Sequence, residues 1–347
     1  MAKLKEVAAL AGVSASTVSR TLSAPHLVNA VTRERVERAV AALDYLPHGA
    51  ARALRSNRSD SIGAVLPALS NELYSAGTDA LQQVLEARGY TLLVTSYRYD
   101  TALELNAVRT LLQRGVDGLV LVGRQHDPAL YAQIAKRRVP YVLAWAWDGV
   151  DDHPAVGYSN RRASAALAAH LLELGHVHFA MISGPLARSD RARDRVAGVR
   201  ETLAEHGLAL RPTHLVETGY ALAAGREAME RLLGVRPRPT AVVCGNDLLA
   251  IAAIAACRDA GLAVPGDVSV AGFGDMEIAS LRSPALTTIR SPIAGIGAAA
   301  GEQILARITG DAAPDRVAFE AELIVRASTG PAPRRRRGRA TPADPSG

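Results

Sequence analysis

The sequence is poor in cysteine and in aromatic residues, and it has no long uninterrupted apolar run. Its 347 residues include two cysteines, Cys244 and Cys257, both in apolar surroundings. So few cysteines argue against a disulfide-stabilised secreted domain and predict buried thiols in a reducing compartment. The apolar runs stay well short of the roughly 18 to 20 residues of a membrane span, and the N-terminus lacks the apolar core of a signal peptide. We therefore expect a cytoplasmic protein.

The positive charge is confined to the two ends of the chain. Residues 1–59 carry nine Lys and Arg against four Asp and Glu, and residues 331–347 carry five Arg against one Asp. The segment between them, residues 60–330, has 26 basic and 29 acidic side chains. A basic head on a mildly acidic body predicts that only the head contacts a polyanion such as DNA. A chain of this length is expected to hold two or more domains.

The stretch from Ser14 to Ser23, Ser-Ala-Ser-Thr-Val-Ser-Arg-Thr-Leu-Ser, has the features of a DNA-recognition helix. Ser14 is a suitable N-cap, and Val18 and Leu22 lie one helical turn apart on one face. A short helix predicted over residues 3–11 and a glycine-containing turn precede the stretch. This succession indicates a helix-turn-helix, whose second helix enters the DNA major groove. Taken alone, the pattern would equally suit an ordinary helical hairpin with a polar outer face.

A third helix is predicted from Thr32, taken as its N-cap. Apolar positions at helical spacing allow the three helices to enclose one small core, made of Leu4, Val7, Val13, Val18, Leu22, Val36, Val40 and Leu43. Pro47 ends this unit, because proline disfavours helix in the residue before it. Residues 48–59 contain good helix formers but almost no apolar face, and so short a helix is largely unfolded in water without a template. They predict either a flexible linker or a segment that becomes helical against DNA.

From Ser61 the pattern changes to apolar strands that alternate with amphipathic helices. The strands are predicted to begin at Ile62, Thr91, Gly118 and Tyr141, and in a second series at His178, Leu215, Ala241 and Val268. This alternation is typical of parallel, doubly wound α/β sheets, and two series predict two sheets. Ligands of such folds bind at the carboxyl ends of the strands, so the cleft between two lobes is the expected site. Residues 331–347, rich in Pro and Arg, are predicted to be a disordered tail.

Short motifs spread over about residues 3–330 carry a family resemblance. They are Val7-Ala8, Ala11-Gly12-Val13-Ser14, Thr17-Val18-Ser19-Arg20, Tyr45 and Pro47, Ala51-Arg52 with Leu54, Ser61-Ile62-Gly63, Leu174-Gly175-His176, Gly184-Pro185, Arg195 with Gly198, Asn246-Asp247, Asp267-Val268-Ser269-Val270 with Gly272-Phe273, and Leu286-Thr287-Thr288-Ile289. In this order and spacing they resemble the lactose-repressor type (LacI/GalR) family of bacterial transcription regulators. Each motif is weak alone, and the series together is specific.

The resemblance implies an α/β protein with a small all-α helix-turn-helix headpiece and a hinge helix, followed by two doubly wound parallel-sheet lobes of periplasmic-binding-protein type. It divides the chain into a headpiece (residues 1–46), a hinge helix or linker (47–60), an effector-binding and dimerisation domain (61–330) and the basic tail (331–347). Within the domain, the N-lobe is expected to comprise about residues 61–158 and 290–317, and the C-lobe about residues 159–289 and 318–330.

The resemblance also implies a DNA-binding transcription repressor, a homodimer on a pseudo-palindromic operator, controlled by a small-molecule effector between the lobes. Its DNA-binding positions correspond to Ser14, Ala15, Ser16, Thr17, Ser19, Arg20, Asn29, His48, Ala51 and Leu54. Ala15, Ser16 and Arg20 are expected to face base edges, and Arg20 can donate two hydrogen bonds to guanine O6 and N7. Thr17, Ser19 and Asn29 are expected near phosphates. Leu54 matches a leucine that wedges into the minor groove, and His48 replaces the usual Asn, which leaves its contact open.

The effector positions of the family correspond to Tyr74, Trp145, Tyr158, Arg195, Tyr220, Asn246, Phe273 and Asp275. Five of them are aromatic in a chain with three Phe, two Trp and nine Tyr, although aromatic residues also fill cores. Gly274 stands where the family commonly has a second Asp, and Trp145 stands where some sugar-sensing members have one. A site with fewer carboxylates and more flat apolar faces leaves a sugar, or a nucleoside, base or other planar metabolite, as the effector. No cofactor and no metal are expected.

Two other functions fit the sequence less well. For an enzyme, Gly295-Ile296-Gly297 resembles part of a dinucleotide-binding loop, but Gly301 follows one place late and no strand leads into it, so helix packing by small residues explains it better. His176 and His178 lack companion ligands, which disfavours a metal site. The alternative, a small-molecule binding protein without a DNA role, would need an export signal and would have no basic headpiece.

Overall fold

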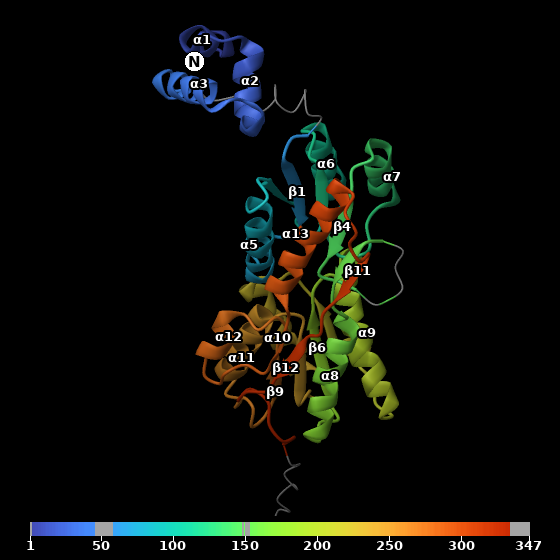
Figure 1. Ribbon diagram of the computed structural model, residues 1–347. Helices are drawn as coiled ribbons and strands as arrows, with labels where there is room; N and C mark the ends of the chain where they lie inside the picture. Colours follow the sequence, from blue (N-terminus) through green and yellow to red (C-terminus); the bar gives the residue numbers. More distant parts are fainter. Residues whose placement is uncertain (1, 46–57, 148, 150–152, 334–347) are drawn as a thin grey trace, which may run out of the picture.

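The computed structural model describes residues 2–45, 58–147, 149 and 153–333, and it shows a small helical unit followed by two α/β lobes (Figure 1). The predicted fold class is therefore confirmed. The predicted hinge helix up to residue 57, and the tail from residue 334, lie outside the described residues. No helix in the described ranges is long and apolar enough to cross a membrane.

The headpiece consists of α1 (Leu4–Ala11), α2 (Ala15–Ser23), the 3-10 turn η1 (Pro25–Leu27) and α3 (Ala30–Ala42). Val7, Val18 and Val36 are fully buried. They pack with the other predicted core residues, which confirms that core: Leu4, Val13, Leu22, Val40 and Leu43.

Two contacts set the headpiece geometry. Gly12 ends α1 in the left-handed conformation (φ 63°), which glycine adopts without steric cost. Arg35 of α3 donates to the carbonyl oxygens of Ala11 at 2.6 Å and of Gly12 at 3.2 Å, and so fixes the turn before α2.

The prediction that Thr32 caps α3 is wrong. Asn29 is the N-cap, because its Oδ1 accepts from the Thr32 N–H at 2.8 Å and starts the helix earlier.

The N-lobe has a six-stranded parallel sheet in the order β11-β5-β4-β3-β1-β2. Its strands are β1 (Ser61–Leu66), β2 (Thr91–Ser96), β3 (Gly118–Val122), β4 (Tyr141–Ala144), β5 (Ala155–Gly157) and β11 (Arg316–Ala318). Its helices are α5 (Glu72–Glu86), α6 (Thr101–Gln113), α7 (Pro128–Arg137) and α13 (Ile293–Thr309). Alternate residues of β3 enter different cores, since Leu119 and Leu121 pack with α6 and α7, and Val120 and Val122 pack with α5 and α13.

Helices α5 and α13 approach closely through glycine. A Cβ atom on Gly297 would lie 2.0 Å from the Gly77 carbonyl oxygen, and one on Gly301 would lie 2.9 Å from a Val84 side-chain carbon. This confirms that the glycines of α13 serve helix packing.

The C-lobe has a four-stranded parallel sheet in the order β7-β6-β8-β9. Its strands are β6 (Phe179–Ser183), β7 (Leu215–Glu217), β8 (Ala241–Cys244) and β9 (Ser269–Ala271). Its helices are α8 (Asn160–Glu173), α9 (Asp190–Glu205), α10 (Leu222–Gly234), α11 (Asp247–Asp259) and α12 (Glu277–Leu281), with 3-10 turns η2 (Leu186–Arg188) and η3 (Pro212–His214). All eight predicted strands are present, each within one residue of its predicted start. Cys244 and Cys257 are buried free thiols, as predicted.

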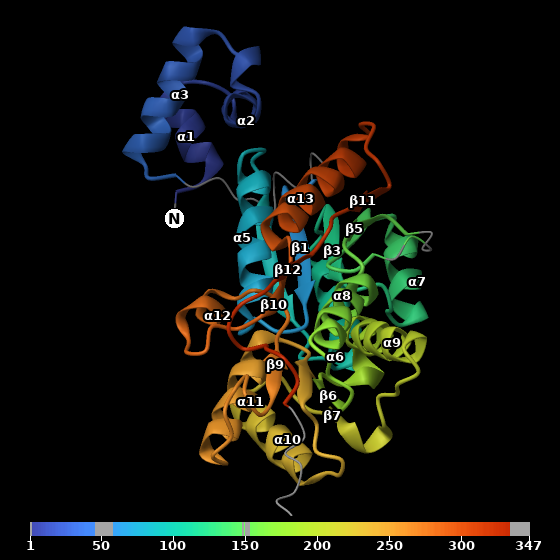
Figure 2. The ribbon, with the colours of Figure 1, turned by 90° about the horizontal axis from the view of Figure 1, so that it is seen from below.

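The chain passes between the lobes three times. It crosses from β5 to α8, from β10 (Thr288–Arg290) to α13, and from β11 to β12 (Glu322–Ile324), and β10 pairs with β12 in an antiparallel ribbon. Figure 2 shows α13 and β11 beside the N-lobe strands, with β9, α10 and α11 in the other lobe. The predicted tail starts at residue 331, but the Ala332 N–H donates to the Leu174 carbonyl oxygen at 2.8 Å, so its first residues pack on the C-lobe.

Candidate functional site

The N-terminus of α2 presents a cluster of hydroxyl groups. Ser14 caps the helix by accepting from the Thr17 N–H at 3.1 Å, which confirms the predicted N-cap. The Ser14 hydroxyl also lies 2.7 Å from the Ser16 hydroxyl and 2.8 Å from the Thr17 hydroxyl. Hydroxyl donors at the positive end of a helix suit an anionic phosphate oxygen.

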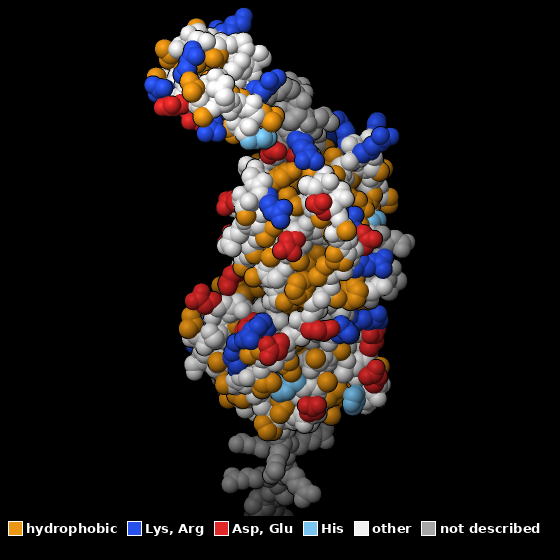
Figure 3. All heavy atoms as spheres, viewed as in Figure 1, with side chains coloured by type: hydrophobic (Ala, Val, Ile, Leu, Met, Phe, Trp, Pro, Cys, Tyr) orange, Lys and Arg blue, Asp and Glu red, His pale blue; other side chains and the backbone are white. Residues whose placement is uncertain are grey.

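The outer face of α2 is otherwise short and polar. Ser16 and Arg20 are exposed, whereas Ala15, Thr17 and Ser19 are half-buried. Lys and Arg side chains are scattered over the headpiece surface among uncharged and apolar ones (Figure 3). Of the other predicted DNA-binding residues, Asn29 is exposed at the start of α3, and His48, Ala51 and Leu54 lie outside the described residues.

A cavity of about 20 Å³ lies between the two lobes, at the carboxyl ends of their strands. Six of the eight predicted effector residues line it: Tyr74, Trp145, Tyr158, Arg195, Tyr220 and Asn246. Trp145 directly follows β4 and Tyr158 directly follows β5 in the N-lobe, while Arg195 lies on α9 and Asn246 follows β8 in the C-lobe. Both lobes therefore contribute to one small site, in the place expected for this fold.

Phe273 supports the site without lining it. The guanidinium carbon of Arg195 lies 3.8 Å from the Phe273 ring centroid, and this ring stacks on Tyr158 with centroids 6.3 Å apart. Arg195 also donates from Nε to Asn160 Oδ1 at 2.8 Å and from Nη1 to the Gly245 carbonyl oxygen. These contacts fix the orientation of the guanidinium.

Asp275 is not brought to the cavity. Its carboxylate accepts from Arg290 at 2.8 Å and from Arg326 at 2.6 Å. Gly274, with φ 135°, precedes it and lies against Leu73. The carboxylate therefore belongs to an ion-pair cluster beside β10 and does not face the lining residues.

Six lining residues were not among the predicted effector residues: Asn71, Leu73, Tyr99, Ser189, Arg191 and Ile293. The Tyr99 ring lies 5.5 Å from the Tyr220 ring, centroid to centroid, and joins the lobes across the cavity. Tyr99 follows β2 by three residues, so the expectation that ligands bind at the carboxyl ends of parallel strands could have identified it. Trp147, by contrast, packs in the second N-lobe core with Tyr131.

Arg191 lies one helical turn before Arg195 and is buried. Its Nη1 donates to Asp190 Oδ1 at 2.8 Å and to the Val122 carbonyl oxygen at 3.2 Å. Burial alone would lower the pKa of Arg191, but Tyr74 and Asp190 raise it above its ordinary value. Burial also raises the pKa of Tyr220. The guanidinium of Arg191 therefore stays charged, and the phenol of Tyr220 stays neutral, at physiological pH.

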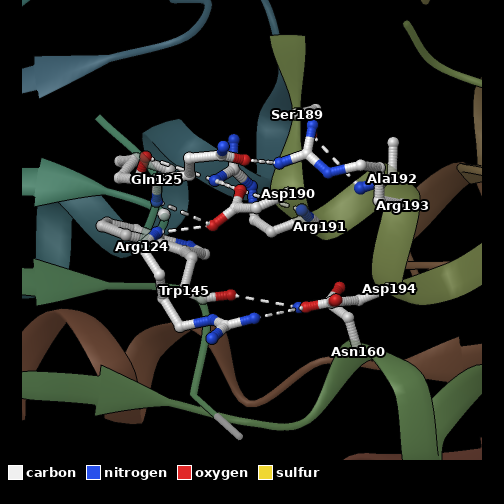
Figure 4. Close-up of polar contacts among 12 residues, drawn as sticks. Arg124, Gln125, Trp145, Asn160, Ser189, Asp190, Arg191, Ala192, Arg193 and Asp194 are labelled. Carbon is white, nitrogen blue, oxygen red and sulfur yellow. Dashed lines mark hydrogen bonds and ion pairs between the residues drawn. The ribbon is translucent and has the colours of Figure 1, made fainter. Parts of the chain in front are cut away.

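A second set of contacts closes one side of the cleft (Figure 4). Asp190 Oδ2 accepts from the backbone N–H groups of Arg124 and, at 3.4 Å, of Gln125. The Arg124 guanidinium pairs with Asp194 at 3.0 Å. Burial would raise the pKa of Asp190, but the charge of Arg191 and the N–H of Arg124 hold it below its usual value. The loop after β3 is thus bound to the first turns of α9.

Two family models match this chain. Residues 3–48 match the model described as bacterial regulatory proteins, lacI family, and residues 168–329 match a periplasmic binding protein-like domain.

Curated relatives and solved structures agree with these matches. The chain is 35% identical over 342 residues to the HTH-type transcriptional regulator reg1 of Streptomyces lividans, which covers 95% of this chain and 97% of the relative. It is 35% identical over 271 residues to the ribose operon repressor of Escherichia coli, covering 77% and 81%. The structure of a lac repressor dimer bound to operator and the anti-inducer ONPF has a TM-score of 0.85 at 30% identity, covering 95% of this chain and 99% of that one.

Proposed function

The chain belongs to the LacI family of bacterial regulatory proteins, and from this premise we propose how its headpiece contacts DNA and how its cleft controls that contact. It is a DNA-binding transcription regulator with an effector-binding domain of periplasmic-binding-protein type, not an enzyme. We infer that it represses transcription from a pseudo-palindromic operator, to which it binds as a homodimer.

The observation that carries the DNA assignment is the surface of α2. Ala15, Ser16 and Arg20 face base edges in the major groove, where the exposed guanidinium of Arg20 donates to guanine. Thr17, Ser19 and the hydroxyl of Ser14 contact phosphates beside them, and Asn29 does so from the start of α3. In the hinge, we infer that Leu54 enters the minor groove and that His48 and Ala51 also contact DNA.

A homodimer is supported by open apolar surface on both lobes. Strand β2 ends the N-lobe sheet, and Val94 on it is 40% exposed. On the C-lobe, a groove of about 340 Å³ between α10 and α11 is lined by apolar residues that include Leu222, Ile251 and Ile254. A second copy covers such surface and sets the spacing of two headpieces, which then match two half-sites.

The effector acts through the angle between the lobes. A ligand that contacts Tyr74, Trp145 and Tyr158 from one lobe and Arg195, Tyr220 and Asn246 from the other favours one relative position of the lobes. The dimer transmits that position to the paired hinge segments and changes how readily they order on DNA.

A mobility-shift experiment on the full chain tests this function. The wild-type chain is expected to retain operator-like duplexes, and a ligand found by thermal-shift screening of sugars, nucleosides and bases is expected to change that retention. Arg195→Ala should keep DNA binding and lose the response. Ligand binding without any DNA retention would instead support a binding protein with no DNA role.

A further inference from the structure

We propose that the effector is a small anion, a molecule with a carboxylate or phosphate group that binds against Arg195 and Asn246. This inference rests on the proposed function, because it assumes that the cavity between the lobes is the effector site.

The first observation is the charge of the lining. Among the described residues that line the cavity there are two arginines and no Asp or Glu: Asn71, Leu73, Tyr74, Tyr99, Trp145, Tyr158, Ser189, Arg191, Arg195, Tyr220, Asn246 and Ile293. A neutral polyol usually needs acceptors for its hydroxyl protons, and this lining offers only amide and hydroxyl oxygens.

The second observation is that two buried donors in the lining have no partner. Trp145 is 3% exposed and Asn246 is 2% exposed, and neither Trp145 Nε1 nor Asn246 Nδ2 has a hydrogen bond. The Oδ1 of Asn246 accepts from the Leu249 N–H at 2.9 Å as the N-cap of α11, so its amide NH₂ is the group left free. A buried donor without an acceptor costs about 1–3 kcal/mol, which a ligand oxygen would remove.

The third observation is that the charge of Arg195 is not compensated. Its hydrogen-bond partners, Asn160 Oδ1 and the Gly245 carbonyl oxygen, are neutral. The nearby carboxylates are engaged elsewhere. Asp190 bonds Arg191 and the loop after β3, while Asp247 accepts from Thr288 Oγ1 at 2.5 Å and from the Met276 N–H at 2.7 Å.

The N-termini of three helices add to the positive electrostatic potential in the cavity. The N-caps of α5, α9 and α11 are Asn71, Ser189 and Asn246, and all three line the cavity. These helices have 15, 16 and 13 residues, so each directs the positive end of its dipole to the same small volume. The acidic residues of their first turns, Glu72, Asp190 and Asp247, do not line the cavity and accept hydrogen bonds from other groups.

An adjoining pocket of about 450 Å³ gives room for the rest of the ligand. Asn246, Tyr99 and Tyr220 line both spaces. The outer pocket adds Arg98 and Arg188, and its described lining also contains no acidic residue. The inner cavity, at about 20 Å³, holds a group the size of a water molecule. One oxygen of the anionic group therefore reaches the inner cavity, and the rest of that group and the body of the ligand occupy the outer pocket.

The test uses calorimetry on the full chain with matched probes: glucuronate and glucose, ribose 5-phosphate and ribose, benzoate and benzyl alcohol, and inorganic phosphate alone. The anionic member of a pair is expected to bind and the neutral member is not. Asn246→Asp keeps the oxygen that caps α11 but replaces the free donor with a carboxylate. It should weaken anion binding by roughly 10- to 100-fold. Asn106→Asp, on α6, is the control and should change nothing.

Three results would overturn the inference: equal or tighter binding of a neutral member, unchanged anion affinity in Asn246→Asp, or no binding of any anionic probe by a chain that retains operator DNA. Operator binding is measured on the same preparations. Its absence in the wild-type chain would instead overturn the proposed function, so the two failures are distinguishable.

Discussion

Arg124 of the N-lobe and Asp194 of the C-lobe form an ion pair 3.0 Å long across the cleft. Beside it, Asp190 accepts hydrogen bonds from the backbone of the same N-lobe loop. The loop follows β3, whose last residue Val122 bonds Arg191 of the cavity lining. We expect a change in the angle between the lobes to break or lengthen these bonds, so an effector that changes this angle is expected to act on this contact.

Asp190→Ala is expected to expose the loop after β3. The amides of Arg124 and Gln125 lose a charged acceptor worth about 1–2 kcal/mol, so their hydrogen exchange should accelerate by roughly 5- to 30-fold. Exchange mass spectrometry of the full chain measures this. Glu201→Ala removes an ion pair with Arg161 that lies within the C-lobe, and it should leave these amides protected. Equal protection in Asp190→Ala would show that the contact does not hold the lobes together.

Arg20→Ala is expected to weaken operator binding by about 1–3 kcal/mol and to relax preference at one base position of each half-site. Fluorescence anisotropy against a set of single-base operator variants measures both effects. Arg38 is a matched control, because it lies on α3 and pairs with Glu34; its alanine variant should keep the base preference. A uniform loss for all duplexes in Arg20→Ala would make Arg20 a phosphate contact.

Gly297→Ala is expected to destabilise the N-lobe. The added Cβ would lie 2.0 Å from the Gly77 carbonyl oxygen, so α5 and α13 have to separate at a cost of about 2–3 kcal/mol. Urea denaturation measures the change in the free energy of unfolding. Gly234→Ala, at the end of α10 with open space around it, is the control and should be close to neutral. Equal stability of the two variants would contradict the close packing.

Asp247→Asn is expected to remove a pH dependence of stability. Burial raises the pKa of Asp247 to about 6, although the bonds from Thr288 and the Met276 N–H oppose the shift. The folded state then holds this proton more tightly than the unfolded state, whose carboxyl has a pKa of about 3.9. Stability from this group is present below about pH 4 and is lost as the pH rises through 6, by roughly 2–3 kcal/mol.

Denaturation of the wild-type chain and of Asp247→Asn between pH 4 and 7 measures this difference. The wild-type free energy of unfolding should fall relative to that of the variant across the window. Asp79→Asn changes an exposed carboxylate on α5 and should follow the wild type. Parallel curves for wild type and Asp247→Asn would show that Asp247 is ionised throughout.

Most of the fold could be predicted from patterns within short stretches of the sequence. The N-cap at Ser14 and each of the eight predicted strands depended on spacing and side-chain type within a few residues. The predicted N-cap of α3, Thr32, was wrong for a reason that is also local. Asn29 and Thr32 can both cap a helix, they lie three residues apart, and Asn29 accepts the hydrogen bond from the Thr32 N–H. The short strands β5, β10, β11 and β12 were not predicted, although β7 and β9, which are equally short, were.

The site was predicted less completely, because its residues meet only after both sheets form. Tyr99 and Arg191 reach the cavity from opposite lobes, and no local pattern relates them. Asp275, in contrast, was predicted to belong to the site but does not line the cavity. It lies two residues from Phe273 in sequence, but the turn at Gly274 and the arginines at 290 and 326 hold it outside the cavity.

Selection of bound duplexes from a random-sequence pool by the full chain is the sharpest test of operator binding. We expect enrichment of an inverted repeat with two equivalent half-sites, because two copies of α2 contact DNA in one symmetric dimer. Enrichment should disappear with Arg20→Ala at the base that Arg20 contacts. Recovery of sequences with no symmetric motif, at the same frequency as in the starting pool, would contradict the assignment of this chain as an operator-binding regulator.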